Sequence, residues 1–215
     1  MDGTLLDLNY DNHFWQEYVP RRYGEKYGLS LESAKQELVP RFRKAEGTLE
    51  WYCVDYWSAQ LGLDIPVLKE EINHLIAVHP HVVEFLEAVN AIDKRIVLVT
   101  NAHGKSLKIK MKHTRLGNFF NNIVCSHDLG LPKEAEGFWQ KFQQTEPFDK
   151  KHTLLVDDSL AVLRAAMQYG INHLLAIKKP DSQLEKRPMQ EFDAIENFKE
   201  IMPDNPGLSI ENHKM

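Results

Sequence analysis

From about residue 95 onward, short apolar runs alternate with amphipathic stretches at helical spacing. The apolar runs are 95–100, 122–126, 153–157 and 173–177, and the helical stretches between them cover 105–116, 134–144 and 160–169. Short continuous apolar runs are typical of strands buried on both faces of a parallel sheet. The pattern therefore predicts an α/β fold, a doubly wound parallel sheet with helices on both faces.

Residues 10–77 have a different character, with aromatic residues at helical spacing and few β-branched runs. Glycine and proline residues divide this stretch, which predicts three or four helices. Helices placed between a first turn and the rest of a sheet indicate an inserted helical cap. We therefore assign 1–9 and 78–202 to the α/β core and 10–77 to the cap. The polar, turn-rich segment 203–215 is expected to be a disordered tail.

The composition is ordinary for a globular protein, with 43% hydrophobic and 27% charged residues and a net charge of −5. Charges of both signs are mixed along the chain, which argues against nucleic acid or an anionic membrane as the main partner. The apolar runs are too short to span a bilayer. Cys53 and Cys125 are far apart in the sequence, so we expect no disulfide framework and a cytoplasmic location.

Polar residues with related chemistry follow the predicted strands. In a parallel α/β sheet, ligands bind beyond the carboxyl ends of the strands. The residues at these ends are Asp2, Gly3 and Thr4 in the first turn, then Thr100, Asn101, Lys133, Asp157, Asp158 and Ser159. Carboxylates hold Mg²⁺, a lysine neutralises phosphate charge, and hydroxyl and backbone N–H groups bind phosphate oxygens. The set predicts phosphoryl transfer on a small phosphorylated substrate.

Four motifs give the chain a resemblance to the haloacid dehalogenase (HAD) superfamily. They are DGTLLD at 2–7, LVTN at 98–101, Lys133 and VDDS at 156–159, in the order of that family. The resemblance implies a Rossmann-like core with a cap, and a Mg²⁺-dependent phosphatase. In such enzymes one aspartate attacks phosphorus to form an aspartyl-phosphate, and a second, two residues later, is the general acid and base. Asp2 occupies the second position, so the nucleophile would directly precede Met1.

Two interpretations of this start remain open, a truncated chain and a genuine pseudoenzyme without its nucleophile. We favour truncation, because the other motif positions are filled and the first core strand is missing as well. In the family that strand lies between the strands that here end at Thr100 and Asp157, so its loss would leave two unpaired strand edges. We expect residues 1–215 as such to show no phosphatase activity and to aggregate readily.

The resemblance assigns a role to each candidate residue. Asp2 and Lys133 would be catalytic, Asp2, Asp157 and Asp158 would bind Mg²⁺, and Thr4, Thr100, Asn101 and His103 would contact the phosphate or substrate. Each residue also has a purely structural interpretation. Adjacent acids can end a strand or cap a helix, and Lys133 can be a surface lysine. The family often places proline after this lysine, whereas here Pro132 precedes it and Glu134 follows.

The cap sequence 44–57, together with TNAH at 100–103 and VDDS, is similar to that of bacterial HAD purine nucleotidases, which act on GMP and IMP. The implied reaction is Mg²⁺-dependent hydrolysis of a purine 5'-monophosphate. A sugar-phosphate phosphatase or mutase and a non-catalytic HAD-like binding module remain as alternatives. The aromatic residues Trp51, Tyr52, Tyr56 and Trp57 are expected mainly in the cap core, and Arg41, Arg43, Lys44 and Glu46 are candidates for substrate specificity. The sequence predicts no oligomeric state.

Overall fold

Parallel strands lie at the centre of the molecule, which is described here by a computed structural model covering residues 1–203. The strands are β1 (Val97–Thr100), β2 (Asn122–Cys125), β3 (Leu154–Asp157), β4 (His173–Ile177) and β5 (Ala194–Ile195). β1 pairs with β2, and β3, β4 and β5 pair in that order, all in parallel register. The predicted α/β fold with a parallel sheet is confirmed.

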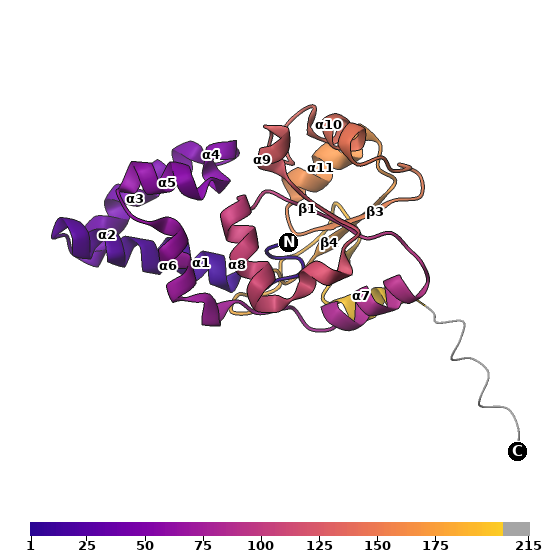
Figure 1. Cartoon of the computed structure of the whole chain (residues 1–215), viewed down its shortest axis with the longest axis horizontal. Coiled ribbons are helices and arrows are strands. Elements are labelled where there is room, and N and C mark those ends of the chain that lie inside the picture. The colour runs from indigo at the N-terminus through magenta and orange to yellow at the C-terminus, as the bar shows by residue number, and fades with distance from the viewer. Residues whose placement is uncertain (204–215) are drawn as a thin grey trace, which may run out of the picture.

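The two groups of strands form separate sheets. Among residues 1–203, no strand pairs with both β1 and β3, so each of these two strands has a strand partner on one side only. The expectation that a first core strand belongs between β1 and β3 stays a prediction. Residues 1–6 form a tight turn instead, in which the Met1 carbonyl accepts the N–H groups of Thr4, Leu5 and Leu6. Figure 1 shows this amino-terminal turn beside the strands.

Helices cover both faces of the strands. They are α7 (Val82–Ala91), α8 (Gly104–Thr114), α9 (Ser126–Leu129), α10 (Phe138–Thr145) and α11 (Leu160–Tyr169), with the 3₁₀ segments η3 (Leu116–Phe119) and η4 (Phe198–Ile201). In Figure 1, α10 and α11 lie on one side of the strands and α7 lies on the other. Phe138 and Leu163 belong to one buried cluster, and Val82 and Ile109 belong to a second.

Helix α11 shows how the sequence sets an element's limits. It begins where the Ser159 side chain accepts the N–H of Val162, and it ends at Gly170, which adopts a left-handed conformation with φ of 98°. A hydroxyl at the N-cap and a left-handed glycine at the end are the usual signals for helix limits. Because Asp158 immediately precedes the N-cap residue, the helix start also fixes where that carboxylate lies relative to β3.

A helical segment precedes α7 and lies to one side of the strands (Figure 1). It comprises α1 (Asn9–His13), the π-helical η1 (Phe14–Tyr18), α2 (Val19–Tyr27), α3 (Leu31–Ala45), α4 (Leu49–Tyr52), α5 (Val54–Leu61), α6 (Ile65–Glu71) and η2 (Asn73–Leu75). We call this segment the cap; the predicted domain limits stay a prediction. Its aromatic residues pack on one another, with the rings of Phe42 and Trp57 5.0 Å apart and Trp57 2% exposed.

The chain passes between core and cap twice, and the two passages lie side by side. The Asp7 N–H donates to the Ala77 carbonyl, and the His79 N–H donates to the Leu5 carbonyl, both at 2.9 Å. An antiparallel bridge joins Leu6 to Val78. Backbone hydrogen bonds therefore tie the outgoing passage to the returning one.

Within residues 1–203, no helix combines the length and the apolar character needed to cross a membrane. The predicted tail, 203–215, lies outside the described residues except for Pro203.

Candidate active site

The turn after Met1 lies against the end of β3. Gly3 has a φ of 72°, and a Cβ built on it would lie 2.4 Å from Oδ2 of Asp158. The Thr4 hydroxyl donates to Oδ1 of Asp158 at 3.2 Å. Glycine is required here for both reasons, since other residues seldom adopt this φ and any side chain would overlap the carboxylate. The first motif and the last motif of the sequence are thus in direct contact.

Lys133 and Asp157 form a buried ion pair at the centre of the site. The Lys133 ammonium lies 2.5 Å from Oδ2 of Asp157, and the two residues are 5% and 3% exposed. Burial alone would raise the pKa of Asp157, but the positive charges of Lys133 and of the Met1 amino group outweigh it and lower that pKa. The burial of Lys133 excludes its interpretation as a surface lysine, and its catalytic role stays a prediction.

Asp158 is in the opposite electrostatic situation. Burial first, and the neighbouring Asp157 second, raise the pKa of Asp158 to about 6. A raised carboxyl pKa means that the surroundings compensate the negative charge of the carboxylate poorly. Lys133 thus balances the negative charge of Asp157, whereas the negative charge of Asp158 remains available to bind a cation.

The amino group of Met1 is buried among these same side chains. Burial lowers its pKa, and the charge of Lys133 lowers it further, while Asp2, Asp157 and Asp158 act in the opposite direction. Met1 is 5% exposed. The position directly before Met1 therefore adjoins Lys133 and the two acids at the end of β3.

Thr100 ends β1, Asn101 follows it directly, and both residues are buried. The Asn101 amide oxygen accepts the N–H of Lys133 at 2.9 Å, and its amide nitrogen donates to Glu134 at 2.8 Å. The Thr100 hydroxyl oxygen accepts the N–H of Ala102 at 3.1 Å. Asn101 thus connects the end of β1 to the loop that carries Lys133, and the phosphate-binding roles predicted for Thr100 and Asn101 stay predictions.

Glu134 and Tyr52 belong to this site but were not among the predicted site residues. The hydroxyl of Tyr52, at the end of α4, donates to Glu134 at 2.8 Å, on the carboxylate that also accepts from Asn101. Burial, and then Glu134, raise the pKa of Tyr52. The sequence offered a partial signal, because Glu134 follows Lys133 and Tyr52 stands in the conspicuous aromatic cluster. The contact joins the cap to the core directly above the strand ends.

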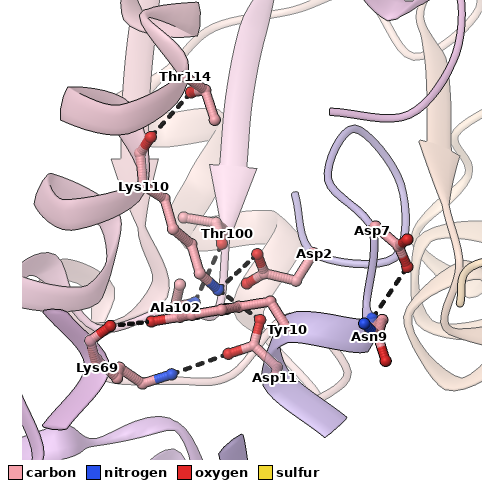
Figure 2. A network of polar contacts seen from close by, with 10 residues as sticks. All are labelled: Asp2, Asp7, Asn9, Tyr10, Asp11, Lys69, Thr100, Ala102, Lys110 and Thr114. Carbon is pink, nitrogen blue, oxygen red and sulfur yellow. Dashed lines mark hydrogen bonds and ion pairs between the residues drawn. The ribbon is translucent and has the colours of Figure 1, made fainter. Parts of the chain in front are cut away.

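The Asp2 carboxylate points to a group of buried charges that sequence reasoning missed (Figure 2). Lys110 of α8 lies 2.7 Å from Asp2 and 2.6 Å from Asp11, and Lys69 of α6 lies 2.9 Å from Asp11. One signal was present: Lys110 shares a helix face with Ser106, next to the apolar Ile109, where the helical pattern calls for buried residues. Nothing in the sequence indicated its partners.

His103 lies at the side of the site that faces the cap. It precedes α8, and its Nε2 is 3.8 Å from a carboxylate oxygen of Asp55 in α5. Burial lowers the pKa of His103, and its ring packs edge-on against His127 with centroids 4.9 Å apart. Its predicted contact with substrate stays a prediction.

The donor set at the strand ends fits a magnesium ion in part. No group of three or more His, Cys, Asp or Glu side chains among residues 1–203 is arranged to hold a metal. The Asp2 carboxylate is paired with Lys110. It therefore does not form a site of three metal-binding carboxylates with Asp157 and Asp158. Mg²⁺ usually keeps several waters and binds through one or two carboxylates and substrate phosphate. Asp158, with Asp157 beside it, satisfies that need.

A cavity of about 720 Å³ opens above these residues, between the core and the cap. Its core side is formed by Asp2, Thr100, Asn101, Lys133, Asp157 and Asp158, and its cap side by residues that include Trp15, Phe42, Arg43, Trp51 and Tyr52. This volume is in the range of pockets that take small organic ligands. Polar groups line one end and aromatic rings the other, so the cavity suits a ligand with an anionic end and a flat apolar end.

Comparison with known proteins decides the family. The sequence profile described as "Haloacid dehalogenase-like hydrolase" matches residues 1–176. The chain belongs to the haloacid dehalogenase-like hydrolases. It is also 37% identical over 203 residues to the GMP/IMP nucleotidase YrfG of Escherichia coli and to that of Shigella flexneri, covering 94% of this chain and 91% of each relative.

Solved HAD structures share the fold. A HAD phosphatase from Thermococcus onnurineus superposes with a TM-score of 0.76 at 18% identity, over 94% of this chain and 93% of that one. The HAD hydrolase YfnB from Bacillus subtilis, solved bound to magnesium, gives a TM-score of 0.63 at 17% identity over 94% and 93%. The predicted HAD membership, the resemblance to purine nucleotidases and the enzyme class, a HAD-type phosphomonoesterase, are confirmed.

Proposed function

We propose that the site hydrolyses purine 5'-nucleotides, with GMP and IMP as the preferred substrates. The observation that carries this proposal is the 37% identity with GMP/IMP nucleotidases, which extends over 94% of the chain and so includes both core and cap. The cavity is consistent with it, because the phosphate would meet Lys133 and Thr100 while the flat base would meet the aromatic cap residues.

The residues would act as follows. Lys133 neutralises the charge of the phosphate, and the hydroxyl of Thr100, which also lines the cavity, donates to one of its oxygens. Mg²⁺, when bound by Asp158 with Asp157, supplies further positive charge at the phosphate oxygens. Asp2 gives a proton to the ester oxygen as the bond from phosphorus to that oxygen breaks. Asp2 then takes a proton from the water that attacks phosphorus in the second step.

The nucleophile in this scheme is an aspartate directly before Met1. One of its carboxylate oxygens forms a bond to phosphorus as the nucleoside leaves, and water then displaces phosphate and restores the carboxylate. The location of the Met1 amino group beside Lys133, Asp157 and Asp158 supports this position for the nucleophile. Residues 1–215 would then bind substrate without hydrolysing it.

Two forms of the protein test the proposal: residues 1–215, and the same chain preceded by an added strand that ends in aspartate. We expect the extended form to release phosphate from GMP and IMP with Mg²⁺ and to lose that activity with EDTA. We expect residues 1–215 to bind GMP in calorimetry but to release no phosphate.

Other outcomes would contradict specific parts of the proposal. Faster hydrolysis of sugar phosphates than of GMP and IMP would overturn the substrate assignment and favour a sugar-phosphate phosphatase or mutase. Equal turnover by both forms would overturn the assignment of the nucleophile. Binding of ligands without hydrolysis by either form would favour a non-catalytic module.

A further inference from the structure

Two lysines are buried side by side between the cap and the core. Lys69, in α6 of the cap, is 2% exposed, and Lys110, in α8 of the core, is 1% exposed. Lysine is rarely buried to this extent unless its charge is paired. Both ammonium groups reach the same carboxylate, that of Asp11 in α1, where Lys69 lies 2.9 Å from Oδ1 and Lys110 lies 2.6 Å from Oδ2.

The charges form a line that ends in the active site. Lys110 lies between Asp11 and Asp2, at 2.7 Å from Oδ1 of Asp2, so the order is Lys69, Asp11, Lys110, Asp2 (Figure 2). Two cations thus alternate with two anions. Burial lowers the pKa of Lys69, whereas the pKa of Lys110 is raised because Asp11 and Asp2 outweigh the effect of burial.

The surroundings hold these groups in place. The Tyr10 ring lies 5.0 Å from the Lys69 ammonium and 5.2 Å from that of Lys110, and the Tyr10 hydroxyl donates to the Lys69 carbonyl at 2.8 Å. The Phe14 ring lies 4.2 Å from the Lys69 ammonium. Cations packed against aromatic rings and out of contact with water cannot change partners without leaving an unpaired charge. The surroundings of the two lysines therefore favour this order of the four groups.

The position of Asp2 depends on this line of charges. Among the described residues, Oδ1 of Asp2 makes no hydrogen bond of good geometry and is buried; the group that faces it is the Lys110 ammonium. A general acid works only within hydrogen-bond reach of the oxygen that it protonates, and a small displacement of such a group lowers the rate strongly. Whatever holds Asp2 therefore influences proton transfer.

We propose that Lys110 is the positioning residue for Asp2, and that Asp11 and Lys69 hold Lys110 in place from the cap. The inference rests on the proposed function, in which Asp2 protonates the leaving group. All three residues also line the cavity, and the proposal assigns them no contact with the reacting atoms. Their effect is to keep the Asp2 carboxylate at the edge of the cavity and to make its placement depend on the packing of α1 and α6 against α8.

The leaving group of the substrate provides the test. The 5'-alkoxide of GMP is a strong base and needs a proton as it departs, whereas 4-nitrophenolate is a weak base and needs little help. We measure kcat/KM for GMP and for 4-nitrophenyl phosphate in the form of the protein that turns over, because kcat/KM reports the steps up to release of the leaving group and excludes the later hydrolysis step, in which Asp2 acts on both substrates alike. Lys110→Met should lower kcat/KM for GMP by about 100-fold and kcat/KM for 4-nitrophenyl phosphate by less than about 10-fold.

Matched variants distinguish a loss of Asp2 positioning from a general loss of protein stability. Lys112→Met changes an exposed lysine of the same helix and should leave both rates unchanged. Lys110→Arg keeps the charge and should restore part of the GMP rate. Equal losses on both substrates in Lys110→Met would indicate a merely structural role and would overturn the proposal.

A charge-balanced double variant tests the part played by the cap, and it remains informative if Lys110→Met does not fold. Asp11→Asn with Lys69→Met removes one anion and one cation and leaves Lys110 paired with Asp2. We expect the ratio of the two rates to shift in the same direction, by about 10-fold. An unchanged ratio would overturn the assignment of Asp11 and Lys69.

Failure of the proposed substrate gives a different result from failure of this inference. If the wild type hydrolyses 4-nitrophenyl phosphate but not GMP, the substrate proposal fails. The same comparison is then made with an alkyl phosphate that the protein does hydrolyse, and the ratio still decides the role of Lys110.

Discussion

The ammonium group of Lys133 lies 2.5 Å from Oδ2 of Asp157, and Lys133 also donates its backbone N–H to Asn101. One residue thus joins the ends of β1 and β3, although these strands belong to separate sheets. The ion pair compensates Asp157 and leaves the charge of Asp158 available. The first predictions concern this division of roles between the two acids.

Replacing Lys133 should destabilise the protein as well as inactivate it. Lys133→Met leaves the Asp157 carboxylate buried without its cation, which should lower the free energy of unfolding by about 3–5 kcal/mol. Chemical denaturation measures this change. Lys108→Met, at an exposed position in α8, is the control and should have almost no effect. A loss of activity without any loss of stability would contradict the buried ion pair.

Replacing Asp158 should have the opposite effect on stability. Its folded-state pKa of about 6 lies above its ordinary value of 3.8, so ionisation of this group costs stability above pH 6, and the cost disappears as the pH falls toward 4. Without metal, Asp158→Asn should therefore raise the free energy of unfolding at pH 7.5 by roughly 1–3 kcal/mol. The difference from wild type should shrink at pH 4.

Asp157→Asn is the matched control for that experiment. The pKa of Asp157 is lowered in the folded protein, so its charge contributes stability at neutral pH that is lost as the pH falls through the folded-state value. This variant should be less stable than wild type at pH 7.5. If both asparagine variants changed stability in the same direction, the proposed division of roles would be wrong. Denaturation curves in EDTA at the two pH values provide the measurement.

Gly3 should tolerate no side chain. Gly3→Ala combines a positive φ with a Cβ 2.4 Å from the Asp158 carboxylate, so Asp158 or the turn must move. Gly28→Ala is a control with a similar φ of 69° and nothing within 4 Å of the added atom. Both should lose about 1–2 kcal/mol of stability from backbone strain. Only Gly3→Ala should also lower kcat, by about 100-fold.

Tyr52 should contribute to closure of the cap over substrate. Tyr52→Phe removes the hydrogen bond to Glu134 and should lower the free energy of unfolding by about 1 kcal/mol. If the contact stabilises the closed arrangement, the KM for GMP should rise severalfold while kcat changes little. The hydroxyl of Tyr56 makes no hydrogen bond to any of residues 1–203, so Tyr56→Phe serves as the control. Equal effects of the two variants would contradict the role of Tyr52.

Much of the core could be predicted from the sequence because its signals are local. The predicted strand 173–177 and helix 160–169 coincide with β4 and α11. The helix predicted from residue 134 begins instead at Phe138, after Gly137 in a left-handed conformation. The Glu134 side chain is engaged with Asn101 and Tyr52, contacts that a local pattern does not reveal.

The cap was harder to predict in detail. Its aromatic spacing predicted three or four helices, and the structure divides residues 9–75 into more, shorter segments. One reason is the π-helical turn Phe14–Tyr18 between α1 and α2, because a continuous periodic pattern does not mark a change of helix type. Another is the short α4, which ends at Tyr52 and is separated from α5 only by Cys53.

The part of the candidate site that lies at the carboxyl ends of the strands could be predicted from the sequence. Parallel strands bring their carboxyl ends together, so Lys133 and Asp157 were expected to meet, and they do. The Lys110 partners were not predictable, because Asp11 is 99 residues away in sequence and pairing of charges over such a distance leaves no local pattern. The buried face of α8 indicated only that Lys110 would be enclosed.

The paired passages between core and cap have a consequence for motion. Because backbone hydrogen bonds hold Leu5 to His79 and Asp7 to Ala77, the two connections are held together, and any rotation of the cap would take place about that line. Points near a rotation axis move least. Asp2, bridged to Leu6 beside the axis, would stay almost still while the distant aromatic wall swings outward, so a ligand would enter from the base end and meet a phosphate site that is already assembled.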